Sequence, residues 1–184
     1  TNIAQAMEFV RGAVRLAPVY YTPGNHEGRL AVYPRLREEL VKAGVRVLED
    51  QKACLAYRGG FIELIGLRDP RFLPPEERKN SQVLEKKLEQ LTEGEENVFR
   101  LLLSHRPELF PIYQKSGVDM VLLVAEPSVS GLSDLRRIVQ TCRGFGTKVA
   151  VCVNKADVAP ESTAAVARFC AEEAIPLLGT IPYD

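Results

Sequence analysis

The segment Asp119-Met120-Val121-Leu122-Leu123-Val124 decides the fold class of this chain. Its run of apolar residues is typical of a strand that is covered on both faces. Downstream, the hydrophobic pattern predicts helices over 133–145 and 160–173, a strand over 148–153, and a last strand that begins at Leu177. Strands that alternate with helices of this length predict βαβ units and a parallel sheet.

Upstream of this segment, the pattern mixes helices, short strands and one hairpin. Helical periodicity covers 3–16, 30–43, 76–97 and 107–115, and strands are predicted at 18–21, 45–48 and 99–103. The runs 53–57 and 61–66 flank Arg58-Gly59-Gly60, which indicates a hairpin. We therefore predict an α/β fold with a mixed, largely parallel sheet, helices on both faces and a β-hairpin insertion.

The composition excludes several classes of protein. The 184 residues fit one domain or two small pieces of domains. The 24 Lys and Arg balance 24 Asp and Glu, which disfavours a nucleic-acid binder held by bulk charge. The sequence contains no run that approaches 18 apolar residues, so no membrane span is expected. The first residues lack the basic and apolar regions of a secretion signal.

The four cysteines indicate a reducing compartment. They are Cys54, Cys142, Cys152 and Cys170, and no two of them form a Cys-x-x-Cys pair. This spacing excludes zinc-finger and iron–sulfur sites. The last three lie in apolar-rich helices or strands, where a free cysteine behaves as a small hydrophobic residue. We expect reduced thiols in a cytoplasmic protein.

The only two histidines, His26 and His105, each follow a predicted strand directly and have polar neighbours. The carboxyl ends of strands are where α/β folds build their sites. A lone histidine is more often an ordinary surface or core residue. Because both histidines of the chain follow strands, their positions are a stronger signal of a functional site than a lone histidine would be.

The residues around both histidines resemble the calcineurin-like metallophosphoesterases, over about residues 1–122. The matching stretches are Tyr20-Tyr21-Thr22-Pro23-Gly24-Asn25-His26-Glu27, Leu102-Leu103-Ser104-His105-Arg106-Pro107-Glu108 and Ser116-Gly117-Val118-Asp119-Met120-Val121-Leu122. The resemblance implies two-metal hydrolysis of a phosphoester substrate, with Mn, Fe, Zn or Mg as the divalent metal. It implies that Asn25 and His105 are metal ligands and that His26 is the general acid or charge stabiliser.

The chain departs from this family at the other motifs of the metal site. The family's Asp-x-His and Gly-Asp strand ends do not occur, and the chain starts after the place where both should be. The closing Gly-His-x-His is replaced by Leu123-Val124-Ala125-Glu126-Pro127. Two neutral ligands without a bridging carboxylate are not expected to hold two metals. We therefore expect the phosphoesterase to be incomplete or inactive in this chain.

A second motif, Val151-Cys152-Val153-Asn154-Lys155-Ala156-Asp157, ends an apolar strand with Asn-Lys-x-Asp. Such an end offers paired hydrogen bonds to a purine edge, although Asn and Asp are also common turn residues. Residues 119–184 resemble the carboxyl half of the MinD/ParA-type ATPases, through 122–135, 148–157 and 179–184. That resemblance implies a nucleotide-binding set of Asn154, Asp157 and Pro182.

The phosphate-binding part of such an ATPase is missing. The sequence contains no Gly-x-x-x-x-Gly-Lys-Ser/Thr loop, so ATP is not expected to bind measurably. Three alternatives stay open: a phosphoesterase-derived hydrolase, a MinD-like nucleotide-binding protein, and a non-catalytic chimeric fragment. The predicted division is 1–122 and 123–184, with the strand at 119–124 shared by both parts in one sheet.

Overall fold

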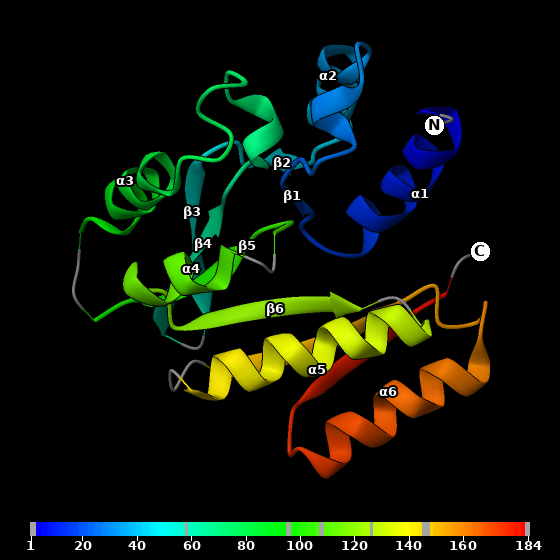
Figure 1. Cartoon of the computed structure of the whole chain (residues 1–184). Coiled ribbons are helices and arrows are strands. Elements are labelled where there is room, and N and C mark those ends of the chain that lie inside the picture. Colours follow the sequence, from blue (N-terminus) through cyan, green and yellow to red (C-terminus); the bar gives the residue numbers. More distant parts are fainter. Residues whose placement is uncertain are drawn as a thin grey trace. The chain divides into compact units, whose positions relative to one another are not determined.

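A computed structural model describes residues 3–57, 59–94, 97–106, 109–125, 127–144 and 148–182 of the chain (Figure 1). By their internal contacts, the residues form two compact units. Unit 1 comprises Thr1–Gly94 with Leu103–His105, and unit 2 comprises Glu95–Leu102 with Arg106–Asp184. The two units are described in turn.

Unit 1 contains the following elements: α1 (Ile3–Leu16), β1 (Tyr20–Tyr21), η1 (Glu27–Arg29), α2 (Tyr33–Lys42), β2 (Arg46–Val47), β3 (Gln51–Tyr57), β4 (Gly60–Gly66), η2 (Pro70–Phe72) and α3 (Ser81–Thr92). A buried cluster joins α1, α2 and β2 and is made of Met7, Tyr33, Leu36, Leu40, Val45 and Val47. The predicted helix over 30–43 is confirmed as α2. It ends as the sequence predicts, because Gly44 adopts a φ of 94° that favours glycine.

The predicted hairpin is confirmed, since β3 and β4 pair antiparallel from Gln51↔Gly66 to Tyr57↔Gly60. The helix predicted over 76–97 is too long. The side chain of Asn80 accepts the N–H of Gln82 and starts α3 at Ser81, while turn hydrogen bonds occupy the backbone before it. Charged residues are common in both turns and helices, so the periodicity of this stretch did not separate the turn before Ser81 from the helix that follows it.

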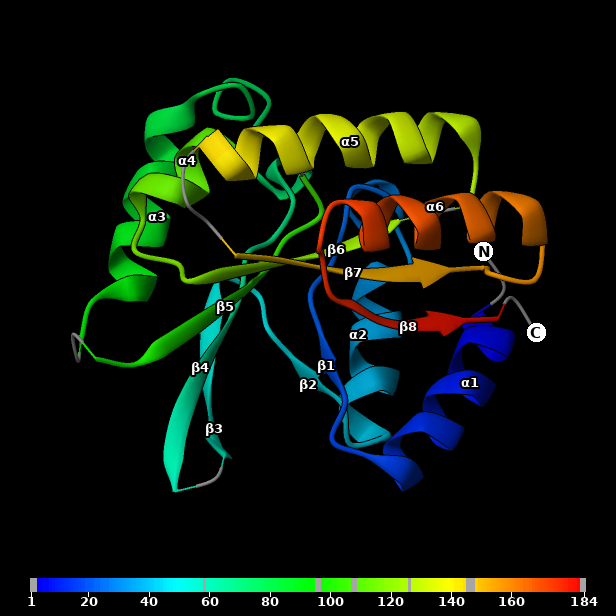
Figure 2. The ribbon, with the colours of Figure 1, turned by 90° about the horizontal axis from the view of Figure 1, so that it is seen from below.

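Unit 2 contains β5 (Phe99–Leu103, of which Leu103 groups with unit 1), α4 (Phe110–Lys115), β6 (Met120–Ala125), α5 (Val129–Gly144), β7 (Lys148–Asn154), α6 (Pro160–Glu172) and β8 (Leu177–Ile181). The strands are parallel and lie in the order β5-β6-β7-β8. Helices α5 and α6 lie side by side against β6 and β7 (Figure 2). The βαβ units that the sequence predicts are thereby confirmed.

Helix α5 begins at Val129, four residues before its predicted start at 133. The hydroxyl of Ser128 accepts the N–H of Gly131 at 2.9 Å and so caps the first turn. The prediction was wrong because the exposed first turn carries no apolar periodicity, whereas the capping serine does mark the start.

The pairing of the strands is mixed and largely parallel: β3–β4 is antiparallel, and β1–β2, β5–β6, β6–β7 and β7–β8 are parallel. The predicted α/β class is therefore confirmed. Among the described residues, no helix is both long enough and apolar enough to cross a membrane.

The cysteine thiols are free, as predicted. Cys142 and Cys170 are buried in the core of unit 2, and burial raises the pKa of the Cys142 thiol to about 11. Cys54 is exposed.

Candidate functional site

Three loops of unit 1 meet where strands end. One follows β1 and contains Pro23, one follows β4 and contains Asp69, and one follows β5 and contains His105. The N–H of Asp69 donates to the carbonyl of Pro23 at 3.3 Å, and the N–H of Leu67 donates to the carbonyl of Leu103 at 3.1 Å. These hydrogen bonds hold the loops together, and we call residues 23–28, 69–72 and 105 the loop cluster.

The imidazole of His105 lies directly against the backbone of Gly24. A Cβ atom built on Gly24 would lie 2.1 Å from Cδ2 and 2.5 Å from Nε2 of His105. No side chain fits there, so glycine is required for the contact rather than for its φ angle. The loop that carries Asn25 and His26 is thereby brought to His105. Asn25 is half-buried, and both imidazoles are exposed.

Glu27 holds the turn that presents Asn25 and His26. Its carboxylate accepts the N–H of Gly24 at 2.9 Å, and the N–H of Gly28 donates to the carbonyl of Gly24 at 3.2 Å. The phenol of Tyr21 lies near the Glu27 carboxylate. Burial, together with that carboxylate, raises the pKa of Tyr21. This role of Glu27 is not visible in the sequence, because it depends on how the turn closes on itself.

A second carboxylate, Glu49, lies at the end of β2. It accepts the phenol of Tyr33 at 2.7 Å and Nε of Arg37 at 2.6 Å. Burial alone would raise the pKa of Glu49, but the hydrogen bonds from Arg37 and Tyr33 outweigh it and lower that pKa. The Glu49 carboxylate is thus committed to a structural network.

Asp50, the next residue, forms an ion-pair cluster with two basic side chains. Its carboxylate lies 2.8 Å from Nη2 of Arg68 and 2.5 Å from Nζ of Lys87, and it accepts the N–H of Arg68 at 3.0 Å. Burial works to raise the pKa of Asp50, but the hydrogen bonds from Lys87 and Arg68 outweigh it, so the pKa is lowered. Asp50 is therefore ionised and paired.

The donor set of the loop cluster does not fit a two-metal centre. Asn25, His26 and His105 offer one amide and two imidazoles, the carboxylate of Glu27 accepts the N–H of Gly24 at 2.9 Å, and that of Asp69 accepts the N–H of Arg71 at 2.8 Å. Within the described part of the chain, no three His, Cys, Asp or Glu side chains are grouped so that they could hold a metal ion. Two divalent cations need a shared carboxylate, whereas the described carboxylates of the cluster, Glu27 and Asp69, already accept backbone N–H groups.

No protein-family model and no curated protein matches this chain.

The predicted nucleotide-contacting residues of unit 2 lie at one edge of its strands. Asn154 ends β7 and pairs in register with Ile181, the last residue of β8. Pro182 directly follows β8. The N–H of Ala156 donates to the carbonyl of Ile181 at 2.9 Å, which fixes the turn that leads to Asp157. Asp157 and Pro182 are exposed, and Asn154 is half-buried. The structure thus brings these three residues together, at a turn that also serves an ordinary strand-to-helix connection.

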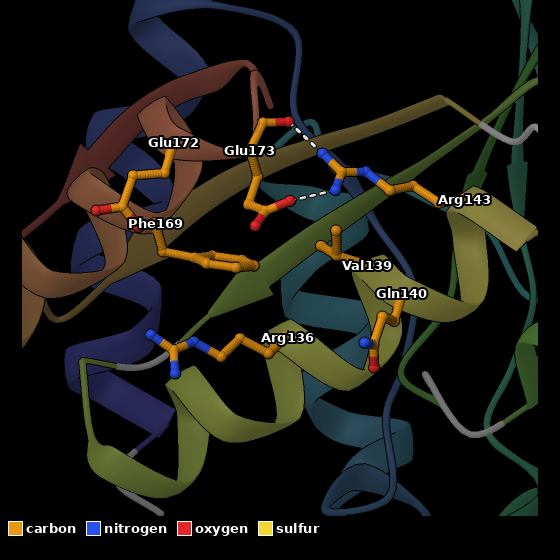
Figure 3. Close-up of a pocket in the computed structure, with 7 residues that line it drawn as sticks. All are labelled: Arg136, Val139, Gln140, Arg143, Phe169, Glu172 and Glu173. Atoms are coloured by element: carbon orange, nitrogen blue, oxygen red, sulfur yellow. Dashed lines mark hydrogen bonds and ion pairs between the residues drawn. The ribbon is translucent and has the colours of Figure 1, made fainter.

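An open groove of about 470 Å³ lies between α5 and α6 (Figure 3). The guanidinium of Arg136 lies over the ring of Phe169, 5.4 Å from its centroid. Arg143 donates to the carboxylate and the carbonyl of Glu173. Both cations are thus already engaged by groups of the groove itself, and none of the predicted site residues lines it.

Proposed function

We propose that unit 1 is a unit of the metallophosphoesterase type whose loop cluster binds one divalent cation weakly, through His105 and Asn25. The observation that carries this proposal is the contact of the His105 ring with Gly24, the residue directly before Asn25. The resemblance of both segments to metallophosphoesterases supports the same assignment and gives a phosphoester as the class of substrate.

We further propose that this chain by itself does not hydrolyse phosphoesters. An imidazole and an amide are neutral, so most of the coordination sphere of a cation would be water. The second metal and its bridging carboxylate would lower the pKa of the attacking water and hold both reacting oxygens. Among the described residues, no group of three His, Cys, Asp or Glu side chains is present to support such a centre.

Cation binding can be followed directly, because the chain has only two histidines and therefore two sets of imidazole signals. We expect paramagnetic Mn²⁺ to broaden the signals of His105 and His26 at millimolar concentration. Asn25→Asp adds a charged ligand and should lower the concentration needed by about tenfold. Asn154→Asp, the same change in unit 2, is the matched control and should have no effect. Equal responses of the two variants would contradict the proposal.

The hydrolytic part is tested with a chromogenic phosphodiester in the presence of Mn²⁺. The parent chain and His105→Ala should give the same rate. A clear excess for the parent chain that survives repurification would show that a carboxylate completes the site. If neither hydrolysis nor Mn²⁺ broadening occurs, the non-catalytic alternative is favoured.

A second candidate function rests on the edge formed by Asn154, Asp157 and Pro182. The in-register pairing of Asn154 with Ile181 supports a purine-contacting edge of the MinD/ParA type. Phosphate contacts supply most of the attraction at P-loop sites, and the sequence has no such loop. Calorimetry should therefore detect no ATP binding. A micromolar dissociation constant would show that a phosphate site exists elsewhere in the chain.

A further inference from the structure

We propose that Arg71 is an oxyanion-binding residue of the loop cluster and takes the phosphate group of a phosphoester. The choice of a phosphoester rests on the proposed function. The assignment of an oxyanion site rests on the placement and hydrogen bonding of Arg71 itself.

The stem of Arg71 lies against the turn that presents Asn25 and His26. A Cβ atom built on Gly28 would lie 2.6 Å from Cβ and 3.1 Å from Cγ of Arg71. Gly28 in turn donates its N–H to the carbonyl of Gly24 at 3.2 Å. The absence of a side chain at residue 28 thus lets the arginine pass close beside the loop of the two candidate site residues.

The backbone of Arg71 is fixed in place before any ligand arrives. Its N–H donates at 2.8 Å to the carboxylate of Asp69, a residue only 2% exposed whose own N–H is bonded to Pro23. The next residue, Phe72, packs edge-on against Tyr33 with ring centroids 5.2 Å apart. A cation held on a fixed segment loses less entropy when it binds an anion.

The Nε–H of Arg71 is buried, and within the described residues it has no hydrogen-bond acceptor. Other arginines of unit 1 use the same atom: Nε of Arg37 donates to Glu49, that of Arg68 to Asp50, and that of Arg78 to the carbonyl of Leu73. Buried polar groups normally find a partner, so an unused donor at this position indicates where a bound acceptor would go.

The ligand class follows from the chemistry of the guanidinium. Its N–H groups match the paired oxygens of phosphate, and Asn25 and His26 add polar groups on the adjoining turn. The carboxylates of Glu27 and Asp69 belong to the same cluster and already accept backbone N–H groups. Their charge opposes a dianion, so the expected dissociation constant is millimolar rather than micromolar.

The test is a titration of the ¹⁵N-labelled chain with inorganic phosphate at constant ionic strength, read at the arginine Nε–H signals. The Arg71 signal should shift and saturate. Arg71→Lys keeps the charge but loses the Nε–H and the planar geometry, so it should weaken binding about tenfold. Arg78→Lys removes an Nε–H that is already bonded to the protein and is the matched control. Amide spectra show whether each variant is folded.

Phenyl phosphate in a parallel titration distinguishes the two sources of the anion. An affinity equal to or above that of inorganic phosphate supports an ester ligand, whereas binding of inorganic phosphate alone supports the oxyanion site and overturns the ester assignment. An Arg71 signal that does not saturate, or an affinity unchanged in Arg71→Lys, overturns the site itself. No metal is present, so this result stands apart from the Mn²⁺ titration.

Discussion

Replacing Gly24 by alanine separates the stability of unit 1 from the geometry of its loop cluster. The new methyl group would lie 2.1 Å from Cδ2 of His105, and ordinary contact begins at 3.4 Å, so the ring must move by about 3.4 − 2.1 = 1.3 Å. His105 is exposed, so its side chain can turn away rather than strain the backbone. We expect a loss of about 1 kcal/mol in the free energy of unfolding, the typical cost of a poor rotamer or slight overpacking.

The displacement of the ring should affect cation binding far more than stability. Misplacing a ligand commonly lowers metal affinity about 10- to 100-fold. In Gly24→Ala, the imidazole signals of His105 should shift, and its Mn²⁺ broadening should require at least tenfold more cation. Urea unfolding measures the stability, and the same spectra measure the geometry.

Gly12→Ala is the matched control, because nothing lies within 4 Å of a Cβ atom at that helical position. It should stabilise the chain by about 0.5–1 kcal/mol through helix propensity and leave both imidazoles unchanged. The reasoning would be refuted if Gly24→Ala left the His105 signals in place, or if it cost more than about 3 kcal/mol.

Three further predictions follow from the ion pairs, thiols and strand pairing. Asp50→Asn should lower the free energy of unfolding by about 2 kcal/mol at neutral pH, because it leaves Lys87 and Arg68 without their carboxylate. Since the folded pKa of Asp50 is lowered, this loss of stability should shrink as the pH falls below about 4 and vanish below the folded pKa. A loss that does not change with pH in urea unfolding would argue against the pairing. A thiol reagent should modify exposed Cys54 rapidly and buried Cys142 only on unfolding, and equal rates measured by mass spectrometry would contradict their burial. Limited proteolysis should not yield two stable bodies cut between β6 and α5, because β6 is paired with β7 over its whole length; recovery of two such bodies would disprove this.

The strands and helices could be predicted wherever neighbouring residues in the sequence determine them. The apolar runs at β6 and β7 and the glycines of the β3–β4 turn fix those elements by themselves. The starts of α3 and α5 could not be placed by periodicity, because Asn80 and Ser128 decide them through hydrogen bonds to the backbone. Capping side chains are polar and do not contribute to the hydrophobic periodicity. A helix start that such a residue decides is therefore misplaced when the periodicity alone is used.

The candidate site was predictable only in part. His26, His105 and Asn25 stand out because they follow strands, and strand ends meet in α/β folds. The roles of Glu27 and Arg71 are not visible in the sequence, since they depend on a turn that closes on itself and on a segment more than forty residues away. Short-range patterns contain no information about such contacts.

The contact of His105 with Gly24 also has a consequence for the order of folding. It joins residues that are 81 positions apart in the sequence. Closing so long a loop costs more entropy than the local contacts of α1 with α2 or of β3 with β4. The loop of Asn25 should therefore take shape early and acquire its histidine neighbour late. Most of unit 1 lies within residues 3–94, so most of its contacts can form before the one with His105.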